Sequence, residues 1–151
     1  MVLLLRELEV EGFRFFKGTY KLKLPEGLTV ISGPVGSGKS SLISAIEYAL
    51  YGTDVNIDRK LYGKRDLIND SSDTARVSLA IEVEGEGFYR FERILTRSGK
   101  EKAVVVLPSG EVVQNAETIR GLVEELTGLD FFEFSRSVAI SHVLLFLLAY
   151  G

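Results

Sequence analysis

The sequence predicts an α/β fold with a mixed sheet, antiparallel hairpins and a few helices. A glycine-rich segment stands between a short apolar run and an amphipathic helical pattern. Alternating apolar and polar residues separated by short turn segments follow, as expected of antiparallel hairpins. Helical periodicity then returns towards the end of the chain. This order contains one strand–loop–helix crossover and differs from a repeating βαβ series.

Length and composition indicate one globular domain. The chain has 151 residues, of which 46% are hydrophobic and 26% charged, a balance typical of a domain with a core. No repeat or linker is visible, so we expect residues 1–151 to form a single domain. Cysteine is absent, which excludes disulfides and thiolate chemistry within the chain and fits a cytoplasmic location. The apolar runs at 1–5 and 143–149 are too short to cross a bilayer, so no membrane association is expected.

The first part of the chain predicts three strands and a helix. Residues 3–13 are rich in apolar side chains, residues 20–24 alternate with a period of two, and residues 28–31 are wholly apolar. A helix is predicted from Lys39, and Gly52 is placed to end it. The side chains expected on its apolar face are Leu42, Ile46, Ala49 and Leu50, with Ile43 beside them.

The remainder predicts a loop, a meander and two helices. Residues 53–74 show no clear period, which favours a long loop that includes one short helix. Strands are predicted at 77–83, 88–96, 103–107 and 112–113, joined by turns rich in glycine. Asn115 is a suitable N-cap for a helix that Gly128 ends. Asp130 and Glu133 have the spacing of a capping box that opens a second helix.

The glycine-rich segment carries the strongest functional signal. Residues 33–40 read Gly-Pro-Val-Gly-Ser-Gly-Lys-Ser, a full match to the phosphate-binding pattern G-x-x-x-x-G-K-[ST]. Glycines let backbone N–H groups turn towards a polyphosphate, and the following helix directs its positive end at the same anion. Lys39 is predicted to reach the outer phosphates as a catalytic group, and Ser40 to ligate Mg²⁺. The predicted phosphate-binding residues are Gly33, Pro34, Val35, Gly36, Ser37, Gly38, Lys39, Ser40 and Ser41.

The sequence around this motif resembles the N-terminal lobe of SMC-like ABC ATPases. Phe13-Arg14 matches the short element that ends the opening strand in that family, and Ala45-Ile46, Ala49-Leu50 and Gly52 match its first helix. Residues 64–68 are similar to the stretch before the family's hairpins. Within the family, the chain most resembles the ATPase subunit of the double-strand-break repair complex (Mre–Rad type). The resemblance covers most of the chain.

This resemblance implies that the chain is one lobe of a larger head, without the coiled coil and the C-terminal lobe. In the family, the second lobe supplies the signature motif and the Walker B carboxylates. The run at 103–107 is the only candidate here for a Walker B strand, but it is followed by Pro-Ser-Gly and has no pair of acidic residues. The implied cofactors are ATP and Mg²⁺; nothing in the residues themselves selects adenine over guanine. The implied partners are the C-terminal lobe, a second ATPase head, a repair nuclease and double-stranded DNA, in the cytoplasm at the nucleoid.

Two positions depart from the family pattern. Val35 stands where the family's phosphate-binding loop carries asparagine. This change should not affect phosphate binding by the backbone N–H groups of the loop. His142 aligns with the Q-loop glutamine, which in the family touches Mg²⁺ and the attacking water. An imidazole could bind that water or ligate a metal, although Mg²⁺ prefers oxygen. The alternative is a histidine at a lobe boundary with no catalytic role.

Several residues have two interpretations. Arg14 either contacts the nucleotide, as the resemblance implies, or is a solvated charge at a strand end.

The basic residues downstream could contact DNA phosphates or could form an ordinary solvated face. The second interpretation is favoured, because carboxylates lie between them and the net charge is -3. These basic residues are Arg59, Lys60, Lys64, Arg65, Arg90, Arg93, Arg97, Lys100 and Lys102. The aromatic residues expected in the core or at a lobe interface are Phe13, Phe15, Phe16, Phe131, Phe132 and Phe134.

The predicted function is ATP binding by a lobe of an SMC-like ATPase. Such an ATPase uses ATP-dependent head dimerisation and hydrolysis in double-strand-break repair or chromosome maintenance. An ABC transporter ATPase is an alternative, against which the long hairpin-rich stretch argues. A stand-alone P-loop kinase or GTPase is another, but it would need a Walker B strand downstream of the motif. The lobe alone is expected to bind nucleotide weakly and to hydrolyse it hardly at all.

Overall fold

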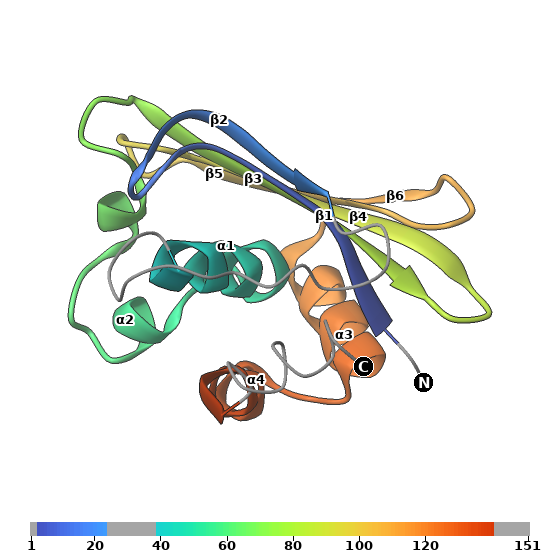
Figure 1. The fold of residues 1–151 in the computed structure, drawn as a ribbon. Coiled ribbons are helices and arrows are strands. Elements are labelled where there is room, and N and C mark those ends of the chain that lie inside the picture. Colours follow the sequence, from blue (N-terminus) through green and yellow to red (C-terminus); the bar gives the residue numbers. More distant parts are fainter. Residues whose placement is uncertain (1–2, 24–38, 141–151) are drawn as a thin grey trace.

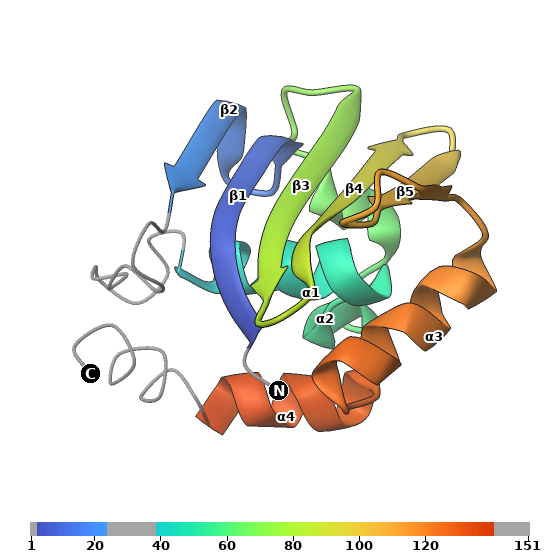
Figure 2. The same cartoon turned by 90° about the vertical axis from the view of Figure 1, so that its right-hand side faces the viewer.

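The computed structural model describes residues 3–23 and 39–140, which form a six-stranded sheet with helices against one face (Figures 1 and 2). The strand order is β2-β1-β3-β4-β5-β6 and every neighbouring pair is antiparallel. The strands are β1 (Leu3–Phe13), β2 (Phe16–Lys23), β3 (Thr74–Val83), β4 (Gly87–Thr96), β5 (Glu101–Val106) and β6 (Val112–Val113). The helices are α1 (Lys39–Tyr51), α2 (Val55–Asp58), the 3-10 helix η1 (Lys64–Leu67), α3 (Ala116–Thr127) and α4 (Phe131–Ile140). The predicted strand at 28–31 and the apolar run at 143–149 lie outside the described residues.

The first hairpin is tighter than the sequence predicts. β2 begins at Phe16 instead of residue 20, because a two-residue turn follows β1 and Phe13 pairs with Phe16. β2 is an edge strand, and all its residues are exposed or half-buried. Burial therefore imposes no alternation on residues 16–19, and only their hydrogen bonding to β1 reveals the strand.

The predicted meander is confirmed. β3 and β4 pair in continuous register from Thr74↔Thr96 to Val83↔Gly87, and β5 pairs next to β4. The odd-numbered residues of β3, such as Val77, Leu79 and Ile81, are fully buried on the helix side. Period-two alternation thus indicated correctly which face of the sheet is the core face.

The opposite face of the sheet carries ion pairs. Arg76 on β3 lies 2.9 Å from Glu9 and 3.5 Å from Glu11, both on β1. Arg90 on β4 donates to Ser78 at 2.8 Å and lies 3.6 Å from Glu7. Cross-strand pairs of opposite charge stabilise such a solvated face modestly.

Helix α1 packs on the inner face of the sheet, against β1, β3 and β4. The predicted end is confirmed: Gly52 has φ 72° and donates its N–H to the Tyr48 carbonyl at 2.8 Å. The predicted apolar face is only partly correct. Ala49 and Leu50 are buried as expected, but Ala45 and Tyr48 are buried too, whereas Leu42 and Ile46 are half-buried.

The two later helices begin as predicted, and α3 also ends where predicted. Asn115 accepts the Thr118 N–H at 3.0 Å, and Gly128 ends α3 with φ 72°. Asp130 and Glu133 exchange backbone-to-side-chain hydrogen bonds of 3.1 and 2.8 Å, which confirms the capping box before α4. These helix boundaries could be predicted because the capping hydrogen bonds join residues that are close together in the sequence.

The aromatic residues divide between core and surface. Phe13 is fully buried, while Phe131 and Phe134 of α4 contact the Tyr51 ring at 5.6 and 5.2 Å between centroids. Phe15 and Phe132 are 66% and 58% exposed, so these two residues are not in the core, and their place at a lobe interface stays a prediction. No helix among the described residues is long and apolar enough to cross a bilayer.

Candidate nucleotide-binding site

The glycine-rich motif leads directly into α1. Residues 33–38 of the motif lie outside the described residues, as does His142. Lys39, Ser40 and Ser41 form the first turn of α1, which confirms the prediction that the helix opens at Lys39. The first turn of a helix presents unsatisfied N–H groups and the positive end of the helix dipole. The individual roles of the motif residues and of His142 stay predictions.

Arg14 occupies the turn between β1 and β2 in an unusual backbone conformation. Its φ is 48°, in the left-handed region that favours glycine. Its N–H donates to the Leu67 carbonyl at 2.8 Å, and its carbonyl accepts from Asn69 Nδ2 at 2.6 Å. Strained backbone of this kind costs about 1–3 kcal/mol and persists where surrounding contacts hold it, often at functional sites.

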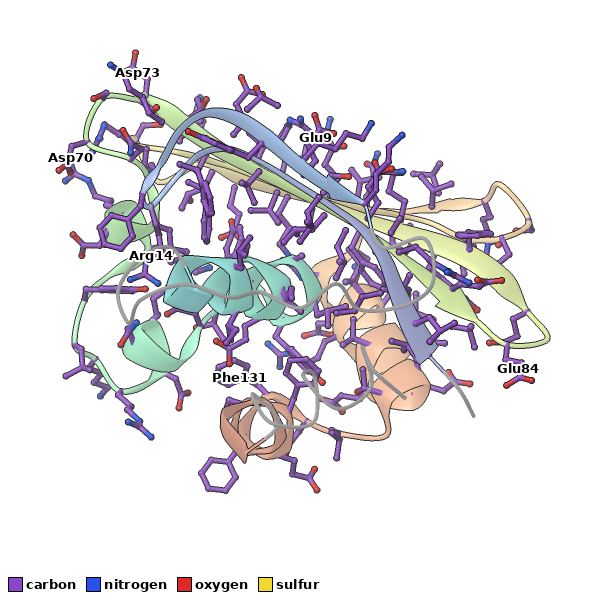
Figure 3. The ribbon with its side chains drawn as sticks, in the orientation of Figure 1. Glu9, Arg14, Asp70, Asp73, Glu84 and Phe131 are labelled. Carbon is purple, nitrogen blue, oxygen red and sulfur yellow. The ribbon has the colours of Figure 1, made fainter. Side chains whose placement is uncertain are left out.

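The Arg14 guanidinium lies between two aromatic rings. Its central carbon is 5.5 Å from the Phe15 centroid and 5.8 Å from the Tyr62 centroid. Within the described part of the chain, Arg14 Nη1 is buried and has no hydrogen-bond partner. This burial argues against the interpretation of Arg14 as a solvated charge. Figure 3 shows Arg14 on the helix side of the sheet.

A buried carboxylate connects the surroundings of Arg14 to α1. Asp54 is 1% exposed, and its Oδ2 accepts from Ser44 Oγ of α1 at 2.5 Å and from the Tyr62 hydroxyl. Its Oδ1 accepts the Ile57 N–H at 2.9 Å, as an N-cap of α2. Burial, followed by the hydrogen bond to Asp54, raises the pKa of Tyr62 to about 12. Tyr62 therefore stays a protonated donor to Asp54 at neutral pH.

Sequence reasoning missed both Asp54 and Tyr62. They fall in the polar stretch 53–74, which showed no period. Asp54 does have one local signal, because an aspartate after a helix-ending glycine is a common N-cap of the next helix. Nothing in the sequence predicts that Tyr62 lies beside Arg14, because the two residues are far apart in the chain and their segments meet where Phe13 pairs with Ile68.

A second buried charge holds the other end of α1. Arg93 of β4 is 9% exposed and donates to the carbonyls of Ala49 at 3.0 Å and Leu50 at 3.3 Å. Its Nη1 lies 3.7 Å from Glu101, which also accepts from the Tyr48 hydroxyl at 3.1 Å. Desolvation lowers the pKa of Arg93, but a guanidinium remains charged. The interpretation of Arg93 as part of a solvated face is therefore wrong.

Other basic residues divide between structural contacts and the surface. Arg97 donates to the carbonyls of Ser72 and Asn69 at 2.9 Å each, which holds the loop before β3. Lys64 contacts Glu101 at 2.6 Å. The prediction of an exposed position is confirmed for Arg59, Lys60, Arg65, Lys100 and Lys102. The described residues contain no group of three or more His, Asp or Glu side chains that could hold a metal.

Known proteins resemble this chain over most of its length. A family model described as AAA domain matches residues 7–146. Arcadin-4 of Pyrobaculum calidifontis is 39% identical over 134 residues, which are 89% of this chain and 16% of that protein. A subunit of the nuclease SbcCD of Bacillus subtilis is 31% identical, over 76% of this chain and 11% of its own length. The DNA double-strand break repair Rad50 ATPase of Archaeoglobus fulgidus is 30% identical, over 82% of this chain and 12% of its own length.

Solved structures share the fold. The SMC head domain from Thermotoga maritima is 26% identical, with a TM-score of 0.58, over 79% of this chain and 41% of that one. A structure of the recombination mediator RecF with ATP has a TM-score of 0.64 at 22% identity and covers 78% of this chain and 30% of its own. The chain thus spans a small part of its relatives. It belongs to the AAA-domain family, and its fold is that of part of an SMC-type P-loop ATPase head.

Proposed function

We propose that this chain is the nucleotide-binding lobe of an SMC-like ATPase and that residues 33–41 hold the phosphates of ATP. The observation that carries the proposal is the complete phosphate-binding motif, which ends where α1 begins, in a member of the AAA-domain family. The first turn of α1 offers N–H donors, and Lys39 adds a full positive charge. Ser40 is the proposed ligand of Mg²⁺, which would neutralise phosphate charge when bound.

Arg14 is proposed as a second cation at the phosphates. Its Nη1 is buried with no hydrogen-bond partner among the described residues, and an unpaired buried guanidinium N–H is costly. A phosphate oxygen would satisfy this donor, because guanidinium groups bind phosphate well. The strained backbone of Arg14 (φ 48°) supports the same role, since such strain collects at functional sites.

The wider role follows from the relatives. The chain spans between 11% and 16% of the length of three of them, so we propose that residues 1–151 act as one lobe beside a C-terminal lobe. Relatives are named for a nuclease complex and for double-strand break repair. We therefore place this chain in DNA repair or chromosome maintenance, in the cytoplasm at the nucleoid. A second head, a repair nuclease and double-stranded DNA are the proposed partners, and His142 is the proposed Q-loop residue.

These relatives favour the SMC-like head over a transporter ATPase and over a stand-alone kinase or GTPase. Basic side chains on the β4–β5 hairpin, such as Lys100 and Lys102, are exposed. Their number is small and Glu101 stands between them, so DNA contact is assigned to the complete assembly and not to this lobe alone.

Titration of the chain with a fluorescent ATP analogue and Mg²⁺ tests the proposal. Lys39→Ala should weaken binding by about ten- to a hundredfold, because it removes a charge-assisted contact worth about 1.5–3 kcal/mol. Lys17→Ala, at an exposed lysine of β2, is the matched control and should bind as the parent does. Unchanged binding by a folded Lys39→Ala variant would refute the proposed site.

A further inference from the structure

We propose that Tyr62, anchored by Asp54, is a positioning residue that fixes the Arg14 guanidinium for contact with the nucleotide. This inference rests on the proposed function, in which Arg14 binds phosphate. Arginine has a long side chain with many rotamers, so binding is stronger when the group is ordered in advance. The structure contains a chain of contacts that orders it.

The backbone of Arg14 is held independently of its side chain. Leu67 accepts its N–H at 2.8 Å, and Asn69 donates to its carbonyl at 2.6 Å. These contacts place the Arg14 Cα but leave the direction of the guanidinium open. A separate element must therefore select the rotamer that brings Nη1 to its buried position.

Tyr62 fits that task better than Phe15 does. Both rings lie within cation–π distance of the guanidinium, at 5.8 and 5.5 Å. The Phe15 side chain belongs to a residue that is 66% exposed, and a hydrocarbon ring at the surface has no polar anchor. Tyr62 is half-buried, and its hydroxyl donates to Asp54 while accepting from Asn56 Nδ2 at 3.2 Å.

Asp54 connects this ring to the helix that opens at Lys39. Its carboxylate accepts from Ser44 Oγ, in the second turn of α1, and from the Ile57 N–H of α2. A buried carboxylate with its acceptor sites filled is a rigid point in the fold. The contacts that lead from α1 through Asp54 and Tyr62 to Arg14 thus fix the position of the β1–β2 turn relative to the first turn of α1. Those two segments carry the proposed phosphate ligands.

A double-mutant cycle on the full chain tests this assignment. ATP affinity and apo-protein melting are measured for the parent, Tyr62→Leu, Arg14→Ala and the double variant. Tyr62→Leu should weaken ATP binding by about three- to tenfold, the range of a partly desolvated cation–π contact. In the Arg14→Ala background the same change should have no further effect. Tyr62→Phe, which keeps the ring and loses the anchor, should fall between the parent and Tyr62→Leu.

The outcomes separate this inference from the proposed function. An equal loss of affinity in both backgrounds would show a purely structural role for Tyr62 and overturn the inference, as would unchanged binding by Tyr62→Leu. Parent-like binding by Arg14→Ala, with binding lost in Lys39→Ala, would refute Arg14 as a ligand and leave the nucleotide site standing. Phe88→Leu, at an exposed aromatic of the β3–β4 hairpin, is the control and should bind ATP normally.

Discussion

At the scale of single residues, the described part of the chain contains buried charges. Arg93 is 9% exposed, yet it contacts the last carbonyls of α1 and the Glu101 carboxylate. A cation at the C-terminal end of a helix interacts favourably with the helix dipole. The close approach also requires Gly52, because a Cβ there would lie 2.7 Å from Arg93 Nη1. Arg93 and Gly52 together therefore end α1 and attach it to β4.

Arg93→Met should lower the free energy of unfolding by about 2–4 kcal/mol. The substitution keeps much of the apolar volume but leaves the Ala49 and Leu50 carbonyls and the Glu101 carboxylate without this donor. Urea denaturation measures the loss. Arg90→Met on the same strand is the control, because Arg90 is 43% exposed by its side chain and should cost below about 1 kcal/mol. Equal effects of the two substitutions would contradict the proposed role of Arg93.

At the scale of elements, α1 is tied to the sheet and to neighbouring helices by polar contacts as well as by packing. Tyr48 is fully buried against Phe13 and donates to Glu101 of β5. Tyr51, at the end of the helix, donates to the Leu129 carbonyl at 2.8 Å, just before α4. Ser44 meets Asp54 at the entrance to α2. The helix thus serves as the common support of β5, α2 and α4.

The buried Tyr48 hydroxyl beside Glu101 predicts that the folded state loses stability at alkaline pH. Burial first, and then the charge of Glu101, raise the pKa of Tyr48 well above its ordinary value of 10.0. The folded state therefore favours the neutral phenol, and this stabilisation is present below about pH 10 and is lost progressively as the pH rises above it. The urea midpoint should fall across this alkaline range, and more steeply in the parent than in Tyr48→Phe. Tyr20→Phe, on the exposed edge strand β2, should keep the parent's slope; a Tyr48→Phe variant with that same slope would contradict the assignment.

At the scale of the whole molecule, the two faces of the sheet differ in chemical character. Apart from Arg93, the inner face is mainly apolar and packs against α1, whereas the outer face carries ion pairs such as those of Arg76 with Glu9 and Glu11. Figure 3 shows Glu9 on the side of the sheet away from the helices. Carboxylates paired with arginines in this way offer little free positive charge to a nucleic acid. This agrees with the net charge of -3.

The chain alone should hydrolyse ATP hardly at all. Its sequence has no acidic pair after an apolar strand to organise the attacking water, and positioning of that water is central to phosphoryl transfer. Phosphate release measured with saturating ATP and Mg²⁺ should be no faster than that of Lys39→Ala. Robust turnover that disappears in Lys39→Ala would show that residues 1–151 hold a complete catalytic site.

Local chemistry explains which features could be predicted from the sequence. The caps at Asn115 and Asp130, the helix end at Gly52 and the hairpins of the meander depend on residues close together in the chain. The phosphate-binding motif is local too, so both it and the start of α1 at Lys39 could be predicted. The start of the edge strand β2 cannot be predicted in the same way, because residues 16–19 are largely exposed and burial imposes no alternation on them.

By itself, the sequence determined the family, the motif and the order of the elements. Only the tertiary structure decided what surrounds Arg14 and Arg93. Arg14 meets Tyr62, and Arg93 meets the end of α1, because antiparallel pairing brings distant segments together. Burial removes these side chains from water, so their neighbours in the fold decide what they contact. No local pattern contains that information, because the partners come from other elements of the fold.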